Sequence, residues 1–304
     1  MALRSADFVD ALDPRFMRIF DEYYTDLPDL VERFFAIESN SKLQTERYSS
    51  IGTIGEIPEF TGTVTADEVY QGYDTSITAL EYARLIEIER RLIDDSQTTA
   101  IERKPKALAS ALYRLRQTHA ARPFNQAFNV DTQFGNNSEA VSLCSNSHTT
   151  TSGAPTTVGF DNQVLTAFNA TALESGRITM VDFRGDRAER IDIMPSLILA
   201  RSNLYGRVYE VIASEGKTET ADNDRNVHYG QYTFVEWNYL DDSNDWYLID
   251  EKMMKDWGLI WVDKNKGEFA FIEDFERLIG RWRVYARWGN HWLNWRWILG
   301  AQVS

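Results

Sequence analysis

The chain reads RWRVYARWGNHWLNWRWIL over residues 281–299, close to its C-terminal end. In the first half of this passage apolar and polar residues alternate, which is the period-two pattern of a β-strand that packs one face. The packed face would hold Trp282, Val284, Ala286 and Trp288. A strand returning beside it would pack Leu293, Trp295, Trp297 and Leu299. The passage therefore predicts an antiparallel hairpin that turns near Gly289 and Asn290.

Four arginines interleave with these tryptophans, and no acidic residue follows Glu276. They are Arg281, Arg283, Arg287 and Arg296. One interpretation is a cationic strip that faces nucleic acid, with the indole rings stacking on bases. The other is a sheet with tryptophans on its packed face and arginines outside or paired with acids. The strict alternation favours the second interpretation.

All nine tryptophans lie between Trp237 and Trp297, so the preceding part of the chain is built differently. There, apolar residues spaced by three and four predict short helices within residues 1–46. The same spacing predicts a helix that Pro105 would open and Pro123 would end, one over 162–173, and one after Ser202. Residues 196–200 have the pattern of a short buried strand. The fold class is α+β.

Residues 51–64 carry glycines and a proline between isolated apolar residues, which is typical of an extended loop. The segments that follow, residues 68–78 and 80–93, would form a long two-stranded ribbon. A lone ribbon of that length is marginally stable in water. We therefore expect this ribbon to pack against another subunit. Residues 142–157, with nine serines or threonines, indicate a further loop.

The composition limits the classes of function. The 304 residues carry 46 acidic and 32 basic side chains, a net charge of −14. Affinity for nucleic acid comes mainly from cations, so the average surface is unsuited to gripping DNA. The sequence contains no uninterrupted run of 18 apolar residues, so we predict no membrane-spanning helix. The single cysteine, Cys144, excludes an internal disulfide and favours synthesis in a reducing cytoplasm.

We predict no catalytic, cofactor-binding or metal-binding residue. The four histidines are scattered without ligand spacing, at His119, His148, His228 and His291. P-loop, nucleophile-elbow and dinucleotide-binding motifs are absent. Residues 215–256 hold eleven acids and four basic residues, so a carboxylate-based hydrolase is an alternative. Its weakness is that no spaced acid pair with a supporting pattern can be named.

Six stretches of the chain occur together in a fixed order. They are FMRIFDEYY at 16–24 with IES at 37–39, ERRLIDD at 89–95, FNQAFN at 124–129, LCSNSH at 143–148, PSLIL at 195–199 and DWYLID at 245–250. In sequence and in order, these stretches resemble the major head proteins of tailed phages of the Mu-like kind. The resemblance is colinear and spans nearly the whole sequence.

The resemblance implies the Hong Kong 97 capsid fold, with five segments along the chain. Residues 1–46 would be the N-terminal arm and 47–93 the extended E-loop. Residues 94–165 would form the first part of the peripheral domain, with its spine helix at about 100–121. Residues 166–257 would form the axial domain, and 258–304 the C-terminal strands of the peripheral domain.

The resemblance also implies a function without catalysis. Such subunits form hexamers and pentamers that close into an icosahedral shell around double-stranded DNA, in a virion assembled in the host cytoplasm. The implied partners are further copies of the chain, a separate scaffolding protein, a portal protein and decoration proteins, with no membrane. The expected contacts with neighbouring subunits are Phe16, Phe20, Ile54, Ile57, Phe60 and Val64. An encapsulin-like nanocompartment, which shares the fold but stores enzymes, is the alternative.

Overall fold

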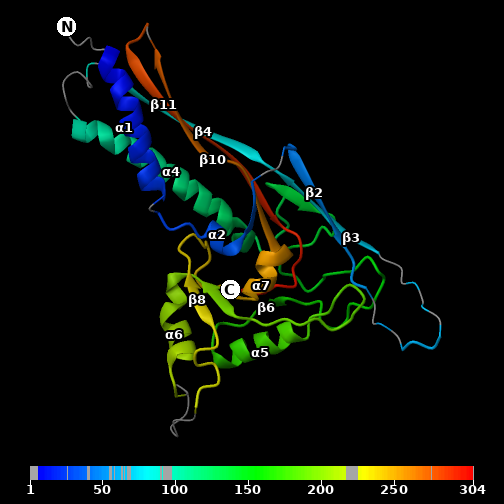
Figure 1. The fold of residues 1–304 in the computed structure, drawn as a ribbon. Helices are drawn as coiled ribbons and strands as arrows, with labels where there is room; N and C mark the ends of the chain where they lie inside the picture. Colours follow the sequence, from blue (N-terminus) through cyan, green and yellow to red (C-terminus); the bar gives the residue numbers. More distant parts are fainter. Residues whose placement is uncertain are drawn as a thin grey trace.

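The computed structural model describes residues 6–25, 27–39, 42–54, 57, 59–62, 64, 66, 70–89, 91, 98–216, 225–274 and 276–303. Figure 1 shows an elongated part, in which long helices lie along a sheet of long strands, and a more rounded part at one end of it. A loop projects sideways from the region where the two parts meet. The chain folds back between the two parts more than once, so neither is a single continuous segment.

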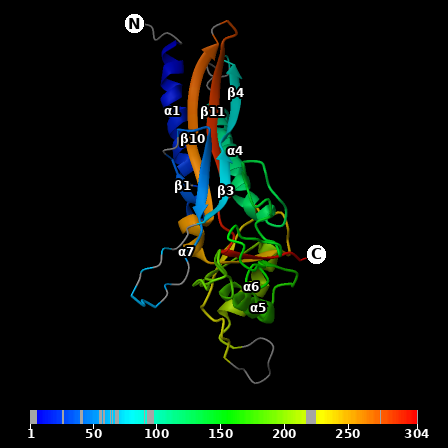
Figure 2. The ribbon, with the colours of Figure 1, turned by 90° about the vertical axis from the view of Figure 1, so that its right-hand side faces the viewer.

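The elongated part contains a four-stranded sheet in the order β1-β10-β11-β4. Its strands are β1 (Ala36–Glu38), β10 (Leu259–Asp274), β11 (Ile279–Trp292) and β4 (Leu80–Glu89). β11 pairs antiparallel with both β10 and β4, and β1 runs parallel to β10. Two long helices, α1 (Ala6–Thr25) and α4 (Thr98–Asn125), lie along this sheet (Figures 1 and 2).

The alternation at the end of the chain predicts β11 correctly. Trp282, Val284, Ala286 and Trp288 are all buried, and they form the face of β11 that packs against the helices. The prediction of the turn is wrong. The hairpin turns at residues 276–278, where Leu278 has a φ of 55°, while Gly289 pairs with Val262 inside the strands. A Cβ on Gly289 would lie 2.6 Å from the Thr78 carbonyl oxygen, so this glycine permits a close crossing of strands rather than a turn.

The helix α4 confirms the long predicted helix but begins before Pro105, its predicted first residue, and its identity as a spine helix stays a prediction. Pro105 lies inside the helix, not at its first position, and Pro123 lies in its last turn. An internal proline removes one backbone hydrogen bond. The helix persists because its apolar face beyond Pro105, which includes Leu108, Ala109 and Leu112, is buried.

The rounded part contains a five-stranded sheet in the order β6-β12-β9-β7-β8. Its strands are β6 (Gln163–Val164), β12 (Ile298–Ala301), β9 (Trp246–Ile249), β7 (Leu197–Ala200) and β8 (Thr233–Glu236). The helical elements beside it are α5 (Ala170–Val181), the 3-10 turn η1 (Ser202–Leu204), α6 (Tyr205–Ala213), α7 (Glu251–Met253) and the π-helical turn η2 (Met254–Gly258).

Two predictions for this part need correction. The helix expected at 162–173 is α5, which begins after Asn169, because the Asn169 side chain accepts a hydrogen bond from the Ala172 N–H. The predicted returning strand is only β12, and it joins the second sheet rather than β11. The buried strand predicted at 196–200 and the helix after Ser202 are confirmed as β7 and α6.

A third sheet has the order β2-β3-β5, with β2 (Thr45–Ile51), β3 (Gln71–Thr78) and β5 (Gly135–Asn137). The predicted pairing of residues 68–78 with 80–93 is wrong. β3 pairs with β2, whereas β4 leaves this ribbon and pairs with β11. The ribbon of β2 and β3 therefore ends at Thr78, because the buried Ala79 separates β3 from β4 and β4 joins the long sheet. Residues 90 and 92–95 of the matching stretch ERRLIDD lie outside the described residues.

The larger of the two hydrophobic clusters among the described residues runs through both parts of the molecule. Phe124, at the end of α4, lies edge-on to Phe34 of the short helix α2 (Val31–Phe34), with their ring centroids 5.6 Å apart. Phe124 also contacts Tyr247 of β9 and Trp297, with ring centroids 5.7 and 6.2 Å away. The helix α4 therefore joins the N-terminal segment to the rounded part through aromatic packing.

Candidate assembly surfaces

The loop between β2 and β3 presents apolar side chains to solvent. Ile54, Ile57, Phe60 and Val64 are 67%, 94%, 70% and 84% exposed. Figure 1 shows this segment projecting away from the rest of the chain. Exposed apolar groups that gather on one projecting segment mark an interaction site. The expectation that these four residues contact a neighbouring subunit stays a prediction.

Phe16 and Phe20 are not surface residues. They lie on α1, are at most 1% exposed, and pack against the long hairpin of the same chain. The rings of Phe16 and Trp282 are 5.2 Å apart, and those of Phe20 and Phe269 are 5.0 Å apart. Their prediction as contacts with another subunit is therefore wrong. An amphipathic pattern shows that a helix buries one face but does not show which chain covers it.

The outer face of the long sheet is balanced in charge. Arg281 lies 2.8 Å from Glu87 and 3.2 Å from Asp274. The adjacent arginines, Arg283 and Arg287, lie 3.5 and 3.7 Å from Glu268 and Glu81. These pairs support the interpretation of paired arginines over that of a cationic strip for nucleic acid.

A buried ionic cluster joins the N-terminal segment, the helix α4 and the long hairpin of β10 and β11. The Arg116 guanidinium on α4 lies 3.0 Å from Asp29 and 3.0 Å from Asp263 of β10. It also lies between two indoles, 4.7 Å from the Trp261 ring centroid and 5.6 Å from that of Trp288. The Arg116 side chain is 2% exposed and that of Asp263 is fully buried. The cluster therefore depends on its internal pairing for its stability.

The histidines and the cysteine have structural surroundings. His148 stacks on Trp295 with ring centroids 4.3 Å apart, and its Nδ1 lies 3.2 Å from Glu139. Cys144 is fully buried, and burial raises the pKa of its thiol. Among the described residues, no group of three or more His, Cys, Asp or Glu side chains could hold a metal ion. Within the same ranges, no helix has the length and apolarity needed to cross a bilayer.

His119 makes the stability of the subunit depend on pH. Its Nδ1 accepts a hydrogen bond of 3.0 Å from the Trp288 indole N–H, which requires a neutral ring. Burial, aided by the positive charge of Arg122, lowers the pKa of His119 from 6.5 to about 4. In the unfolded chain the ring takes up a proton near pH 6.5, whereas in the folded chain it stays neutral until about pH 4.

We therefore expect the contribution of the neutral His119 ring to the free energy of unfolding to be complete above pH 6.5. This contribution should be lost as the pH falls to about 4. The loss should reach at most about 3 kcal/mol, since each pH unit in that window costs about 1.36 kcal/mol. Urea unfolding at several pH values measures it. His119→Gln keeps a hydrogen-bond acceptor without titrating, so it should show a shallower slope in this window. Equal slopes for the variant and the native chain would contradict the assignment.

Three acids of the segment 215–256 hold nearby backbone groups. Asp242 accepts from the backbone N–H groups of Asn244 and Asp245. Asp245 accepts from the Val303 N–H, and Asp250 caps α7. Asp222 lies outside the described residues. These roles give no support to the hydrolase alternative.

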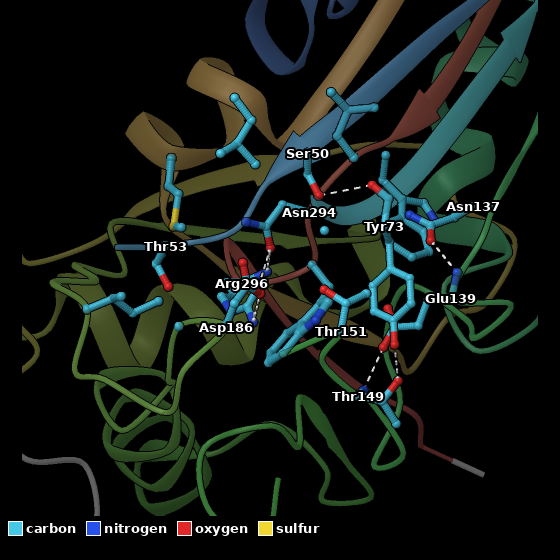
Figure 3. Close-up of a pocket in the computed structure, with 18 residues that line it drawn as sticks. Ser50, Thr53, Tyr73, Asn137, Glu139, Thr149, Thr151, Asp186, Asn294 and Arg296 are labelled. Carbon is cyan, nitrogen blue, oxygen red and sulfur yellow. Dashed lines mark hydrogen bonds and ion pairs between the residues drawn. The ribbon is translucent and has the colours of Figure 1, made fainter. Parts of the chain in front are cut away.

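A cavity of about 160 Å³ lies at the base of the projecting loop (Figure 3). One wall comes from the ends of β2 and β3, with Ser50, Thr53 and Tyr73. The other walls come from residues 137–151, 185–191 and 292–296. Sequence reasoning identified residues 142–157 only as a loop and missed their contact with β3. Their unusual content of serine and threonine was the signal that could have indicated it.

A family model described as phage capsid protein matches residues 72–300, about three quarters of the chain. No curated protein matches the chain. Among solved structures, the chain is similar to one from the mature capsid of bacteriophage PhiM1, with a TM-score of 0.62 and 9% identity, covering 91% of this chain and 88% of that chain. It is also similar to a chain from Mycobacterium phage Patience, with a TM-score of 0.56 and 11% identity, covering 97% of this chain and 88% of that chain.

A third similar structure is a chain from the capsid of an empty GTA particle, with a TM-score of 0.55 and 11% identity, covering 91% of each chain. At such low identities the structural likeness shows the fold alone. That fold is the capsid fold expected from the sequence.

Proposed function

The chain belongs to the phage capsid protein family, and from that premise we propose that it is the major head subunit of a tailed phage, whose copies form hexamers and pentamers of an icosahedral shell around double-stranded DNA. The observation that carries the assembly role is the projecting E-loop with its exposed Ile54, Ile57, Phe60 and Val64. These side chains gain burial when they lie on a neighbouring copy. The role is structural rather than catalytic.

The charge of the chain suits a container. A net charge of −14 gives little affinity for the phosphate backbone, so DNA can be enclosed and released without tight binding. The proposed partners are further copies of the chain, a scaffolding protein, a portal protein and decoration proteins. The proposed location is the virion, after assembly in the host cytoplasm, and we propose the Mu-like kind of head protein as the subfamily.

The contents of the shell distinguish a phage head from the encapsulin-like alternative. We expect the purified chain, alone or co-expressed with its scaffolding protein, to form shells that negative-stain microscopy and light scattering detect. Nucleic acid inside shells isolated from infected cells supports the phage head. Shells that enclose an enzyme and no nucleic acid would support the nanocompartment.

Charged substitutions in the E-loop test the assembly role directly. Ile57→Asp and Phe60→Asp should each lower the yield of shells by about tenfold or more, because a buried unpaired carboxylate opposes association. The free energy of unfolding of the unassembled subunit should change by less than about 0.5 kcal/mol, since both side chains are exposed. Light scattering and urea unfolding provide the two measurements.

The matched controls keep the apolar character at the same positions. Ile57→Val and Phe60→Leu should assemble nearly as well as the native chain. If the Asp variants assemble as efficiently as these controls, the E-loop does not make the contact proposed here.

A further inference from the structure

We propose that the segment Thr149–Thr150–Thr151–Ser152 is a positioning element, which fixes the direction in which the E-loop leaves the subunit. The importance of this direction for assembly rests on the proposed function. The positioning itself is a property of the single chain. On one side, the segment is bonded to the turn that contains Asp186, and Asp186 pairs with the buried Arg296. On the other side, the segment binds the start of β3.

The contacts to the E-loop all fall on the first residues of β3. The hydroxyls of Tyr73 and Thr149 share a hydrogen bond of 2.6 Å. The Thr151 hydroxyl donates to the Gln71 carbonyl oxygen at 2.8 Å. These side chains meet beside the cavity in Figure 3, where Tyr73 points toward Thr149. Thr149 and Thr151 thus each form a hydrogen bond to β3, one to Tyr73 and one to Gln71.

The opposite side of the segment is anchored to the body of the subunit. The Thr150 hydroxyl donates to the Asp186 carbonyl oxygen at 2.6 Å, and the Ser152 hydroxyl donates to the same oxygen. The Asp186 carboxylate in turn lies 3.0 Å from the Arg296 guanidinium. Arg296 is 8% exposed and lies over the Trp295 ring, 4.9 Å from its centroid. A charge-assisted pair that is packed in this way provides a rigid support.

The β2 side of the loop lacks an equivalent support among the described contacts. The cavity separates Ser50 and Thr53 from Asn294 and Arg296, and the Thr53 hydroxyl is buried without a hydrogen-bond partner. The pairing of β2 with β3 is also irregular between Ser49 and Ile51. The third strand of this sheet, β5, pairs only with Thr75, Ser76 and Ile77 of β3, so this pairing does not include Gln71 and Tyr73. The hydrogen bonds on β3 therefore decide how the E-loop projects.

The test measures the direction of the E-loop in the unassembled subunit. Spin labels are placed at Ile57→Cys on the E-loop and Val130→Cys on the body, both exposed positions, while the buried Cys144 stays unlabelled. Electron–electron double resonance then gives the distribution of distances between the labels. Thr149→Val and Tyr73→Phe remove the same hydrogen bond from its two ends. We expect each variant to broaden the distribution by about twofold, the effect of losing one modest interaction.

Two further variants separate positioning from general stability. Thr149→Ser retains the hydroxyl and should restore the narrow distribution. Thr45→Val removes the hydroxyl contact of 2.9 Å between Thr45 and Thr78 at the other end of the same ribbon, and should leave the distribution unchanged. An unchanged distribution in both Tyr73→Phe and Thr149→Val would overturn the inference. Equal broadening in Thr45→Val would also overturn it.

The same variants, without labels, are then tested for assembly. A broadened distribution together with a lower yield of shells is the expected result. Normal assembly despite a broadened distribution would overturn the claim that the direction matters. If the native chain forms no shells even with its scaffolding protein, the proposed function fails, whereas the distances in the single subunit still decide the positioning role.

Discussion

Asp263→Ala should lower the free energy of unfolding by about 3–5 kcal/mol, because it leaves the buried Arg116 guanidinium without its fully buried carboxylate partner. The two side chains lie 3.0 Å apart and are almost fully inaccessible to solvent. Their atoms are close but not aligned as a hydrogen bond, so the attraction is chiefly that of opposite charges. The second partner of Arg116, Asp29, is partly exposed and is shared with Gln117. Asp29 therefore cannot replace the lost carboxylate.

The matched control removes both charges. Arg116→Met combined with Asp263→Leu fills a similar volume without a buried ion, so it should be much less destabilised than Asp263→Ala alone. Urea unfolding of the unassembled subunits measures both. A loss of less than about 1 kcal/mol in Asp263→Ala would show that water or Asp29 compensates the charge, contrary to this argument.

The cluster also explains a feature of β10 that alternation could not predict. The pairing of β10 with β11 shifts register between Asp263 and Asn265 and again before Glu268. Asp263 points into the core at the start of this irregular stretch, toward the helix α4. A bulge changes the direction of a side chain at the point where pairing is interrupted. The ionic cluster and the bulge are therefore parts of one junction between the sheet and α4.

The parts of the fold that the sequence predicts are those with a strong local period. The alternation over Trp282, Val284, Ala286 and Trp288 predicts the packed face of β11, and helical spacing predicts α4 and α6. The turn of the long hairpin was missed because residues 276–278 contain neither glycine nor proline. The partner of β4 was missed because alternation identifies a strand but not its neighbour.

The candidate site was predictable only in part, for a similar reason. The exposure of Ile57 and Phe60 follows from apolar residues in a stretch rich in glycine. The support of the E-loop does not follow from any local pattern, because Thr151 meets Gln71 across 80 positions of sequence. Hydrogen bonds from side chains to a distant backbone leave no periodic trace. The structure is needed to bring such residues together.

Phe34→Ala should have an effect as large as the loss of Asp263, although it removes no charge. The Phe34 ring is fully buried, stacks on Trp237 with centroids 5.1 Å apart, and lies edge-on to Phe124. Replacing a buried phenylalanine by alanine costs about 3–5 kcal/mol. The helix α2 that carries Phe34 has only four residues, so it depends on this packing rather than on its own backbone.

The location of Phe34 makes the result informative about cooperativity. Because Phe34 touches both the helix α4 and Trp237 beside the second sheet, its loss weakens the junction of the elongated and rounded parts. Urea unfolding followed by tryptophan fluorescence should show a lower midpoint in Phe34→Ala, with Met17→Ala on the exposed side of α1 as the control. A loss below about 1 kcal/mol would mean that the junction repacks without the ring. The N-terminal segment would then be an appendage rather than part of the core that α4 organises.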